Sequence, residues 1–237
     1  MRRPLALSAL AFAPLLLGAQ TGVEDAAPRP PRASIGFRGV SAQPVGAFGD
    51  AINVGWGGGL DGRVHLDRAG AVSLRADVDY VGYGNRRQPV SLFPAAGSLI
   101  RGRLRTTNTF VTLLVGGELA QPDGPLRPYV HGGIGATYFR TGSSLGGSDR
   151  FEDEGFATTN VDDWARTAVA GGGLRIPIGR GRRTLTLLDL GARRAWIGPT
   201  TYATPDDIVQ GPAGPDVVPR RSRTDHWLIT AGFAVVY

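Results

Sequence analysis

Two glycine-rich segments contain the residue types of a serine hydrolase. Residues 131–135 (HGGIG) match the pattern of an oxyanion-hole segment, and residues 142–146 (GSSLG) match a nucleophile elbow with Ser144 as the nucleophile. An elbow lies between a strand and a helix, and it follows the oxyanion segment at a much greater distance along the chain. Ser144 falls in a Gly/Ser-rich stretch with no helical pattern after it, which we interpret as a loop. The sequence therefore argues against an acyl-transfer site.

An acidic stretch has the oxygen ligands that a divalent cation would need. Its spacing does not fit an EF-hand, so a solvated acidic loop is favoured over a metal site. The carboxylates concerned are Asp149, Glu152, Asp153, Glu154, Asp162 and Asp163. The chain has no Cys, which excludes thiolate metal sites, disulfides and a cysteine nucleophile. We expect no metal and no cofactor.

Charged residues also recur at alternate positions in otherwise apolar segments. In residues 71–83 the even positions from Val72 to Tyr80 are apolar, whereas the odd positions from Ser73 to Asp79 are polar. This period of two is typical of a β-strand with one apolar and one polar face. The polar faces together carry carboxylates and guanidinium groups in nearly equal number, which suits a closed network of ion pairs. The predicted network contains these charged residues and two histidines that share their faces. Its members are Asp61, Arg63, His65, Arg75, Asp77, Asp79, Glu118, His131, Arg175, Asp189 and Arg193.

Strand patterns recur along the whole chain after its first 32 residues. The predicted strands are residues 33–41, 55–66, 71–83, 107–120, 127–140, 164–178, 184–197 and 225–237. Short, turn-forming sequences separate the second strand from the third, the fourth from the fifth and the sixth from the seventh. The other connections are long and polar, and they span residues 42–54, 84–106, 141–163 and 198–224.

This alternation of short and long connections predicts an eight-stranded antiparallel up-and-down transmembrane β-barrel, an all-β fold. Tight turns line one rim of such a barrel and long loops line the other, and we expect the turns to be periplasmic and the loops extracellular. In residues 225–237 the odd positions, from Trp227 to Tyr237, are large and apolar, whereas the even positions are smaller. Aromatic residues at strand ends favour a barrel with its apolar face toward lipid and its polar face inside. A soluble sandwich with one wetted face is the alternative.

The first 20 residues have the pattern of a signal peptide. Arg2 and Arg3 precede an apolar run that ends at Leu17, and small residues follow. Residues 21–32 form a polar, Pro-rich leader, and residues 33–237 form the predicted barrel domain. The formal net charge is +6 and all 26 basic residues are Arg, but they are scattered, so we predict no nucleic-acid binding.

Together these features resemble the small OmpA/OmpX-type barrels of the bacterial outer membrane, the "outer membrane protein β-barrel" group. The segment from Gln43 to Gly84 is similar to the first hairpins of that group, and the resemblance covers the whole mature chain by pattern. It implies a Gram-negative-type cell envelope and an aromatic C-terminal strand that the barrel-assembly machinery recognises. Phe233, Val235 and Tyr237 match that assembly signal. Some relatives carry a peptidoglycan-binding domain after the barrel, which we do not expect here.

Two groups of arginines in the predicted loops suit contacts with outer-membrane lipid. Arg binds phosphate through two parallel hydrogen bonds, so these residues are candidates for lipid head-group contacts, and a solvated run of charge is an equal alternative. The candidates are Arg86, Arg87, Arg101, Arg103 and Arg105 in one loop, and Arg220, Arg221 and Arg223 in another.

The sequence thus predicts a non-enzymatic outer-membrane protein with a side-chain-filled interior and a structural or surface-recognition role. An eight-stranded barrel is just wide enough for side chains to fill. One alternative is a narrow channel for small solutes, if the interior pairs rearrange. Another is a lipid-modifying enzyme, but His65, His131 and His226 are expected near the periplasmic half of the barrel, away from the outer rim where such chemistry occurs. The sequence does not identify a partner for the loops.

Overall fold

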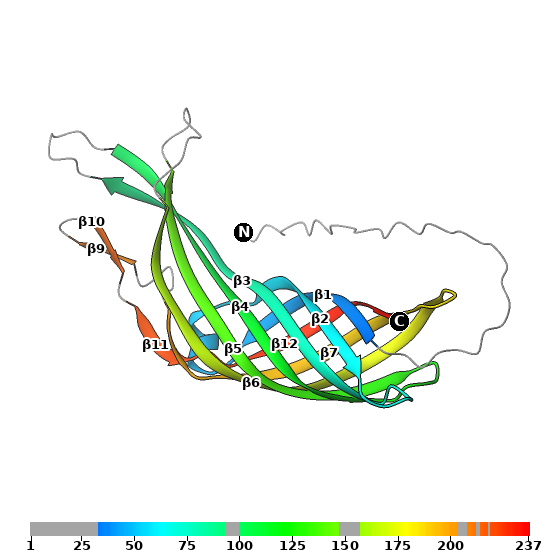
Figure 1. Ribbon diagram of the computed structural model, residues 1–237. Coiled ribbons are helices and arrows are strands. Elements are labelled where there is room, and N and C mark those ends of the chain that lie inside the picture. Colours follow the sequence, from blue (N-terminus) through cyan, green and yellow to red (C-terminus); the bar gives the residue numbers. More distant parts are fainter. Residues whose placement is uncertain (1–32, 93–99, 147–156, 203–207, 212–213, 218) are drawn as a thin grey trace.

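The computed structural model describes residues 33–92, 100–146, 157–202, 208–211, 214–217 and 219–237. The predicted signal peptide (1–20) and leader (21–32) lie outside these residues. Eight strands form one closed antiparallel barrel in the order β1-β12-β7-β6-β5-β4-β3-β2, as the sequence predicts (Figure 1). The strands are β1 (Ala33–Pro44), β2 (Gly55–His65), β3 (Val72–Leu92), β4 (Ile100–Ala120), β5 (Arg127–Gly146), β6 (Ala157–Arg180), β7 (Leu185–Ile197) and β12 (His226–Val236).

The barrel closes where its first strand pairs with its last. β1 and β12 are antiparallel along their whole length, with Phe37 opposite Phe233, and the amide of Tyr237 donates to the carbonyl of Ala33 at 2.9 Å. An unpaired strand edge in hydrocarbon leaves amide and carbonyl groups without partners, which costs several kcal/mol for each group. Pairing β1 with β12 removes the two edges that a linear eight-stranded sheet would expose.

Short turns join the strands at one rim, which we call the turn end. They link β2 to β3, β4 to β5 and β6 to β7, and Gly70 and Gly124 adopt positive φ angles there, at 79° and 103°. The carboxylate of Asp67 accepts hydrogen bonds from the amides of Val72 and Ala71, at 2.8 and 3.2 Å. The bond from Val72 is the main reason that the pKa of Asp67 lies below its ordinary value.

The opposite rim, which we call the loop end, is more structured than the sequence suggested. β3 and β4 stay paired as far as Leu92 and Ile100, and β5 and β6 stay paired as far as Ser144 and Ala157 (Figure 1). Most of the predicted loops 84–106 and 141–163 is therefore strand. Three of these extensions, residues 84–92, 141–146 and 157–163, have polar residues at both odd and even positions, so they lack the apolar alternation from which we predicted strands. Residues 100–105 do alternate, with Ile100 and Leu104 against three arginines, but the run is short and was assigned to the loop.

The two remaining connections also contain regular elements. The first contains a short helix, α1 (Ala47–Ala51). The last contains β8 (Pro199–Tyr202) paired with β11 (Arg220–Arg223), and β9 (Ile208–Gly211) paired with β10 (Gly214–Val217). Within the described residues, no helix is long and apolar enough to cross a membrane.

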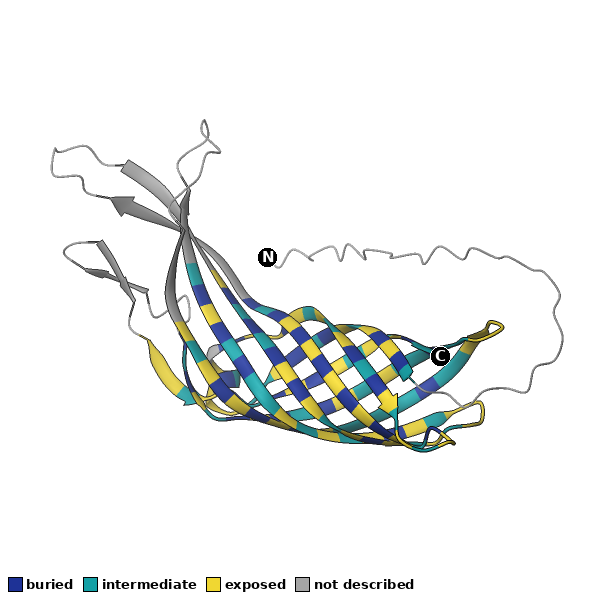
Figure 2. Cartoon of the chain, viewed as in Figure 1, coloured by how far each residue is buried: buried dark blue, intermediate teal, exposed yellow. Residues whose placement is uncertain are grey.

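Buried and more exposed residues alternate along those parts of the barrel strands whose side chains are described (Figure 2). The exposed positions are mainly apolar: Leu60 is 51% exposed, Ile134 68% and Phe233 47%, whereas the buried positions include many charged residues. A protein in water buries its large apolar side chains, and an exposed apolar patch of this extent marks a membrane or interaction surface. The predicted facing, with the apolar side out, agrees with the structure on all eight strands.

This facing predicts unequal effects of substitution on β12. Phe233→Asp places a carboxylate on the apolar exterior and is expected to lower the free energy of unfolding by about 1–3 kcal/mol, because a charge on the lipid face is poorly solvated. Thr230 faces inward, where its hydroxyl donates to the carbonyl of Gly191 at 3.3 Å, so Thr230→Ser keeps this bond and costs less. Denaturant unfolding in lipid vesicles measures both, and equal losses would contradict the facing.

Candidate functional site: the barrel interior

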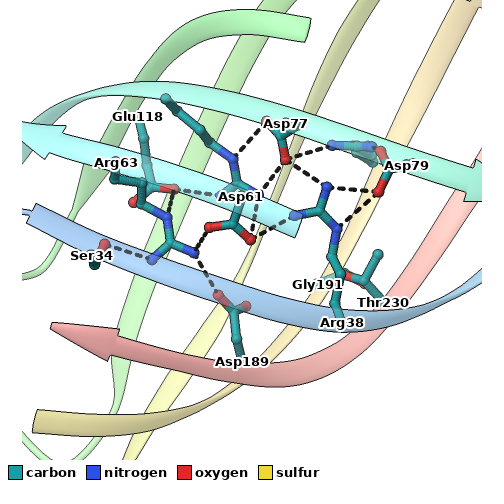
Figure 3. A network of polar contacts seen from close by, with 12 residues as sticks. Ser34, Arg38, Asp61, Arg63, Asp77, Asp79, Glu118, Asp189, Gly191 and Thr230 are labelled. Atoms are coloured by element: carbon teal, nitrogen blue, oxygen red, sulfur yellow. Dashed lines mark hydrogen bonds and ion pairs between the residues drawn. The ribbon is translucent and has the colours of Figure 1, made fainter. Parts of the chain in front are cut away.

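Arg38 is at the centre of a layer of charged side chains that crosses the barrel interior. It projects inward from β1, and its Nη1 atom lies 2.6 Å from Oδ1 of Asp61 (Figure 3). Its Nη2 atom lies 2.7 Å from both Asp77 Oδ1 and Asp79 Oδ1. One guanidinium group thus joins carboxylates on β2 and β3 to the first strand.

Two further arginines hold the same β3 carboxylates from other directions. Arg75 donates to Asp77 at 2.9 and 3.0 Å and to Glu118 on β4 at 2.6 Å. Arg193 projects from β7, where its Nη1 atom lies 3.1 Å from Asp77 Oδ1 and its Nη2 atom bonds Asp79. Because β7 and β3 are opposite one another in the strand order, Arg193 ties together two sides of the barrel.

Arg63 and Arg175 connect the rest of the layer. Arg63 bonds Asp61, its neighbour on β2, and lies 3.5 Å from Glu118 and 3.4 Å from Asp189 on β7. Arg175 on β6 lies 2.7 Å from Glu118 and 3.0 Å from Asp189. Each of these acidic groups therefore contacts more than one guanidinium group, which is the condition under which buried charges are tolerated.

Tyr129 completes the layer on β5. Its hydroxyl donates to Asp189 Oδ1 at 2.7 Å, and the Arg175 guanidinium lies 4.0 Å from the centre of its ring. Two interior glycines provide the space for this side chain. A Cβ atom on Gly173 or Gly191 would lie 2.6 or 2.7 Å from the Tyr129 hydroxyl oxygen, closer than packed atoms approach.

Glycines also make room for the acidic groups. A Cβ atom on Gly36 would lie 2.7 Å from Oδ1 of Asp61, and a Cβ atom on Gly59 would overlap the carboxylate of Asp79. Interior glycines therefore allow long charged side chains to cross a narrow barrel. This gives part of the high glycine content a specific role beyond turns.

The sequence prediction missed two members of the layer. Arg38 lies within the predicted strand of residues 33–41 but was left out of the predicted network, and Tyr129 was not considered. Strand alternation identifies both. Arg38 lies between the outward Phe37 and Gly39, and Tyr129 lies two residues before His131, so it is on the same face of the strand. With Arg38 included, five arginines face five carboxylates: Arg38, Arg63, Arg75, Arg175 and Arg193 with Asp61, Asp77, Asp79, Glu118 and Asp189.

The charged layer is almost closed to solvent. Side-chain exposure is 6% or less for all its ionised groups except Asp189, which is 13% exposed. A cavity of about 10 Å³ remains, lined in part by Arg38, Asp61 and Tyr129. That volume is about the minimum that one water molecule needs.

The two histidines of the predicted network face inward at its margin. His65 Nδ1 lies 2.8 Å from the hydroxyl of Ser73, near the turn end. The ring of His131 lies 5.9 Å from that of Tyr129, and among the described residues neither of its nitrogens has a hydrogen-bond partner. Neither histidine joins an ion pair within the described residues, so the structure brings together the charged members of the predicted set and leaves the histidines beside them.

His226 lies at the loop end, contrary to the prediction that all three histidines are in the periplasmic half. It is the first residue of β12, which follows the last loop and runs toward the turn end. Its Nδ1 atom donates to the carbonyl of Thr224 at 2.9 Å, and its ring lies 5.0 Å from that of Phe110. The prediction was wrong because a strand that follows a long loop begins at the loop end, so its first residue cannot lie near the turns.

Toward the loop end the barrel interior changes from charged to apolar. Phe48 on α1 is fully buried, and its ring lies 5.3 Å from Tyr202, 5.7 Å from Tyr83 and 6.3 Å from Phe139. This apolar layer was not predicted from the sequence, although the inward positions of β3 to β5 turn aromatic there. Its members are Val40, Ala42, Phe48, Ile52, Val81, Tyr83, Phe110, Leu114, Phe139, Ala165, Val169, Ala195, Ile197, Tyr202 and Leu228.

The arginines proposed for lipid contacts lie on strands and not in loops. Arg86 and Arg87 are on β3 and Arg101, Arg103 and Arg105 are on β4, where only the backbone is described; Arg87 pairs with Arg105. Arg220, Arg221 and Arg223 are on β11 and are exposed. The two groups therefore lie on different hairpins at the loop end.

The motifs first considered for catalysis and metal binding have other structures. Ser144 lies within β5, paired with Arg105, and not in the loop that we expected or in a strand–helix elbow. Asp162 and Asp163 lie on β6, where Asp163 accepts a hydrogen bond from the amide of Thr201 at 2.9 Å. In the described ranges, no three His, Asp or Glu residues are grouped so that they would hold a metal ion. The remaining acidic residues of this stretch, Asp149, Glu152, Asp153 and Glu154, lie outside the described residues.

The closed sheet and its apolar exterior define the class of the protein, which is an outer-membrane β-barrel. No family model matches the sequence, and no curated protein matches it.

Several solved barrel structures are similar to the chain. Neisserial surface protein A is 14% identical over 86% of this chain and 96% of its own, with a TM-score of 0.45. Ail, the attachment invasion locus protein of Yersinia pestis, is 11% identical over the same shares, with a TM-score of 0.38. The outer membrane protein OprG from Pseudomonas aeruginosa is 13% identical over 88% of this chain and 97% of its own, with a TM-score of 0.41.

The charged layer predicts a sharp difference between two adjacent arginines. Arg193→Ala leaves Asp77 and Asp79 buried with one cation fewer, and we expect it to lower the free energy of unfolding by about 3–5 kcal/mol. Arg194 points outward and lies 3.7 Å from Asp225, so Arg194→Ala should cost less than about 1 kcal/mol. Denaturant titration of both variants in vesicles tests this, and a loss at Arg194 as large as that at Arg193 would contradict it.

Proposed function

We propose that the protein is a non-enzymatic outer-membrane barrel that does not conduct solutes and has a structural or surface-recognition role. The observation that carries this proposal is the charged layer, in which Arg193 bonds from β7 across to β3. A solute would have to displace several mutually bonded charges from a space that holds about one water molecule. The apolar layer around Phe48 lies across the same path toward the loop end.

The same proposal assigns the two rims. The turn end is periplasmic and the loop end extracellular, since outer-membrane barrels have short periplasmic turns and longer external connections. The hairpin extensions, β8 and β11 then form the surface available to external partners. Exposed arginines on β11 suit contacts with phosphates of the outer leaflet.

Conductance separates a closed barrel from the alternative of a narrow channel. The purified protein in a planar lipid bilayer is expected to give no stepwise openings over a range of voltages. A sixteen-stranded porin inserted into the same membrane serves as the positive control, because barrels of that size leave an aqueous channel. Reproducible openings of the wild-type protein would overturn the non-conducting function.

The absence of catalysis is tested by mass spectrometry of lipid A from cells with and without the protein, where identical spectra are expected.

A second part of the proposal concerns assembly. The outward positions Phe233, Val235 and Tyr237 on the last strand would serve as the signal for the barrel-assembly machinery, as in the family that the sequence resembles. Deleting Tyr237 is expected to reduce the amount of folded protein in the outer membrane several-fold, whereas Thr230→Ser leaves it unchanged. Heat-modifiable gel mobility of membrane fractions measures folded protein. Because deletion of Tyr237 also removes its bond to Ala33, refolding of purified protein into vesicles is the control. An equal loss in the purified system would argue against a signal.

A further inference from the structure

The apolar layer at the loop end is filled by a residue that does not come from the barrel wall. Phe48 belongs to α1, in the connection between β1 and β2, and its ring makes edge-on contacts with Tyr83, Phe139 and Tyr202. The interplanar angles of these contacts are 65°, 90° and 84°. Edge-to-face packing at these separations is the arrangement that aromatic rings prefer. The wall therefore forms a site for one aromatic ring, and the side chain of Phe48 occupies it.

The helix that carries Phe48 has few bonds of its own. It has five residues, and no side chain caps its N-terminus. Helices of this length are unstable in isolation, so its position depends on tertiary contacts. Within the helix, the amide of Asp50 donates to the carbonyl of Gly46 at 3.0 Å. Just before the helix, the amide of Val45 donates to the carbonyl of Asp225 at 3.1 Å. Burial of Phe48, together with that of Ile52 directly after the helix, thus attaches α1 to the barrel.

The wall around this site includes buried hydrogen-bond acceptors that no donor of the described residues reaches. Asn108 and His226 are each 1% exposed, and among the described residues Asn108 Oδ1 and His226 Nε2 have no hydrogen-bond partner. The Nδ1 atom of His226 donates to the carbonyl of Thr224, so in the neutral ring Nε2 is an acceptor. His226 is joined to the site by ring contacts, since Phe110 lies 5.0 Å from His226 and 5.5 Å from Phe139. Asn108 lies on β4 two residues from Phe110 and on the same face of the strand. The hydroxyls of Tyr83 and Thr224 are also buried without a hydrogen-bond partner among the described residues, but a hydroxyl can donate or accept, whereas Asn108 Oδ1 and the free ring nitrogen of His226 can only accept. Buried acceptors normally have partners, so we infer that a ligand of this site is one that donates.

We propose that the loop-end half of the barrel interior is a binding site for a small aromatic molecule that carries one N–H or O–H donor. The ligand's ring takes the place of the Phe48 ring, its donor bonds to Asn108 or His226, and α1 moves outward. The charged layer forms the floor of the site, so the ligand binds and returns by the same route without crossing the barrel. Small-molecule sites typically combine such an apolar lining with a few polar groups that fix orientation.

The probe for this site is indole. Movement of α1 can be followed with a spin label on a single introduced cysteine. The chain has no Cys, so a spin label at Asp50→Cys, on the exposed face of α1, reports only the position of that helix. The protein is studied in lipid nanodiscs, with empty nanodiscs subtracted to remove partitioning into lipid. We expect indole to increase the mobility of this label with saturation. A label at Ala69→Cys, in the turn between β2 and β3, should not respond.

Two comparisons test the chemistry of the site. N-methylindole has the same ring without the donor and should bind at least about ten-fold more weakly, since it leaves the acceptors unpaired. Phe48→Ala removes the internal competitor, so it should bind indole about ten-fold more tightly, because a ligand's apparent affinity falls with the fraction of protein in which its site is occupied. Phe37→Ala, which removes a lipid-facing ring of the same size, is the control and should bind as the wild-type protein does.

The inference is overturned if, with Phe48 in place, indole shows no saturable binding and does not change the mobility of the label at position 50. This holds even if the Phe48→Ala variant binds indole. Binding in that variant alone would show an engineered cavity. Equal affinities for indole and N-methylindole would also overturn it, since the acceptors would then have no part. These results are independent of the proposed function, because a barrel that binds indole reversibly still shows no conductance.

Discussion

Closure of the sheet is the constraint on which the rest of this structure depends. Every amide and carbonyl group in the hydrocarbon region needs a partner, and a linear sheet always leaves two edges without them. Pairing β1 with β12 satisfies both edges. Closure also separates the residues of every strand into an outer and an inner set, because successive side chains alternate across the sheet. The lipid requires the outer set to be apolar, but it makes no demand on the inner set.

The inner set is constrained by space and charge instead. Eight strands enclose a volume that side chains just fill, and long charged side chains fit into it only where neighbouring positions are small. Gly36 and Gly59 lie beside the carboxylates of Asp61 and Asp79, where a Cβ atom would collide. Charge must also balance, since an unpaired ion in so dry a space costs several kcal/mol. The match of five arginines to five carboxylates satisfies this condition, and the network rigidly links opposite walls of the barrel.

The period of two accounts for how much of this structure was predictable from the sequence. Alternation identified the eight strands, their facing and most of the charged layer, because lipid imposes that pattern on every strand that crosses it. It failed where lipid imposes nothing. The extensions of β3, β5 and β6 beyond the barrel have polar residues at both odd and even positions, and the alternating run in the extension of β4 is short, so all four were assigned to loops. The apolar layer was missed because Phe48 lies on a helix in a connection, and no local pattern shows that a loop residue enters the barrel. Arg38 was missed for a simpler reason, since alternation within residues 33–41 places it on the face opposite Phe37 and only the charge count omitted it.

The two interior layers impose different conditions on anything that enters the barrel. The charged layer is held by directional bonds that share partners, so moving one arginine disturbs several carboxylates at once. The apolar layer is held by burial, which is not directional, and its central ring belongs to a five-residue helix whose loss would leave all strand pairings intact. Rearrangement of the interior is therefore less costly at the loop end than at the charged layer. The few non-directional contacts of Phe48 could therefore be exchanged for those of another aromatic group without breaking the charged layer, which is the physical basis of the ligand site that we propose.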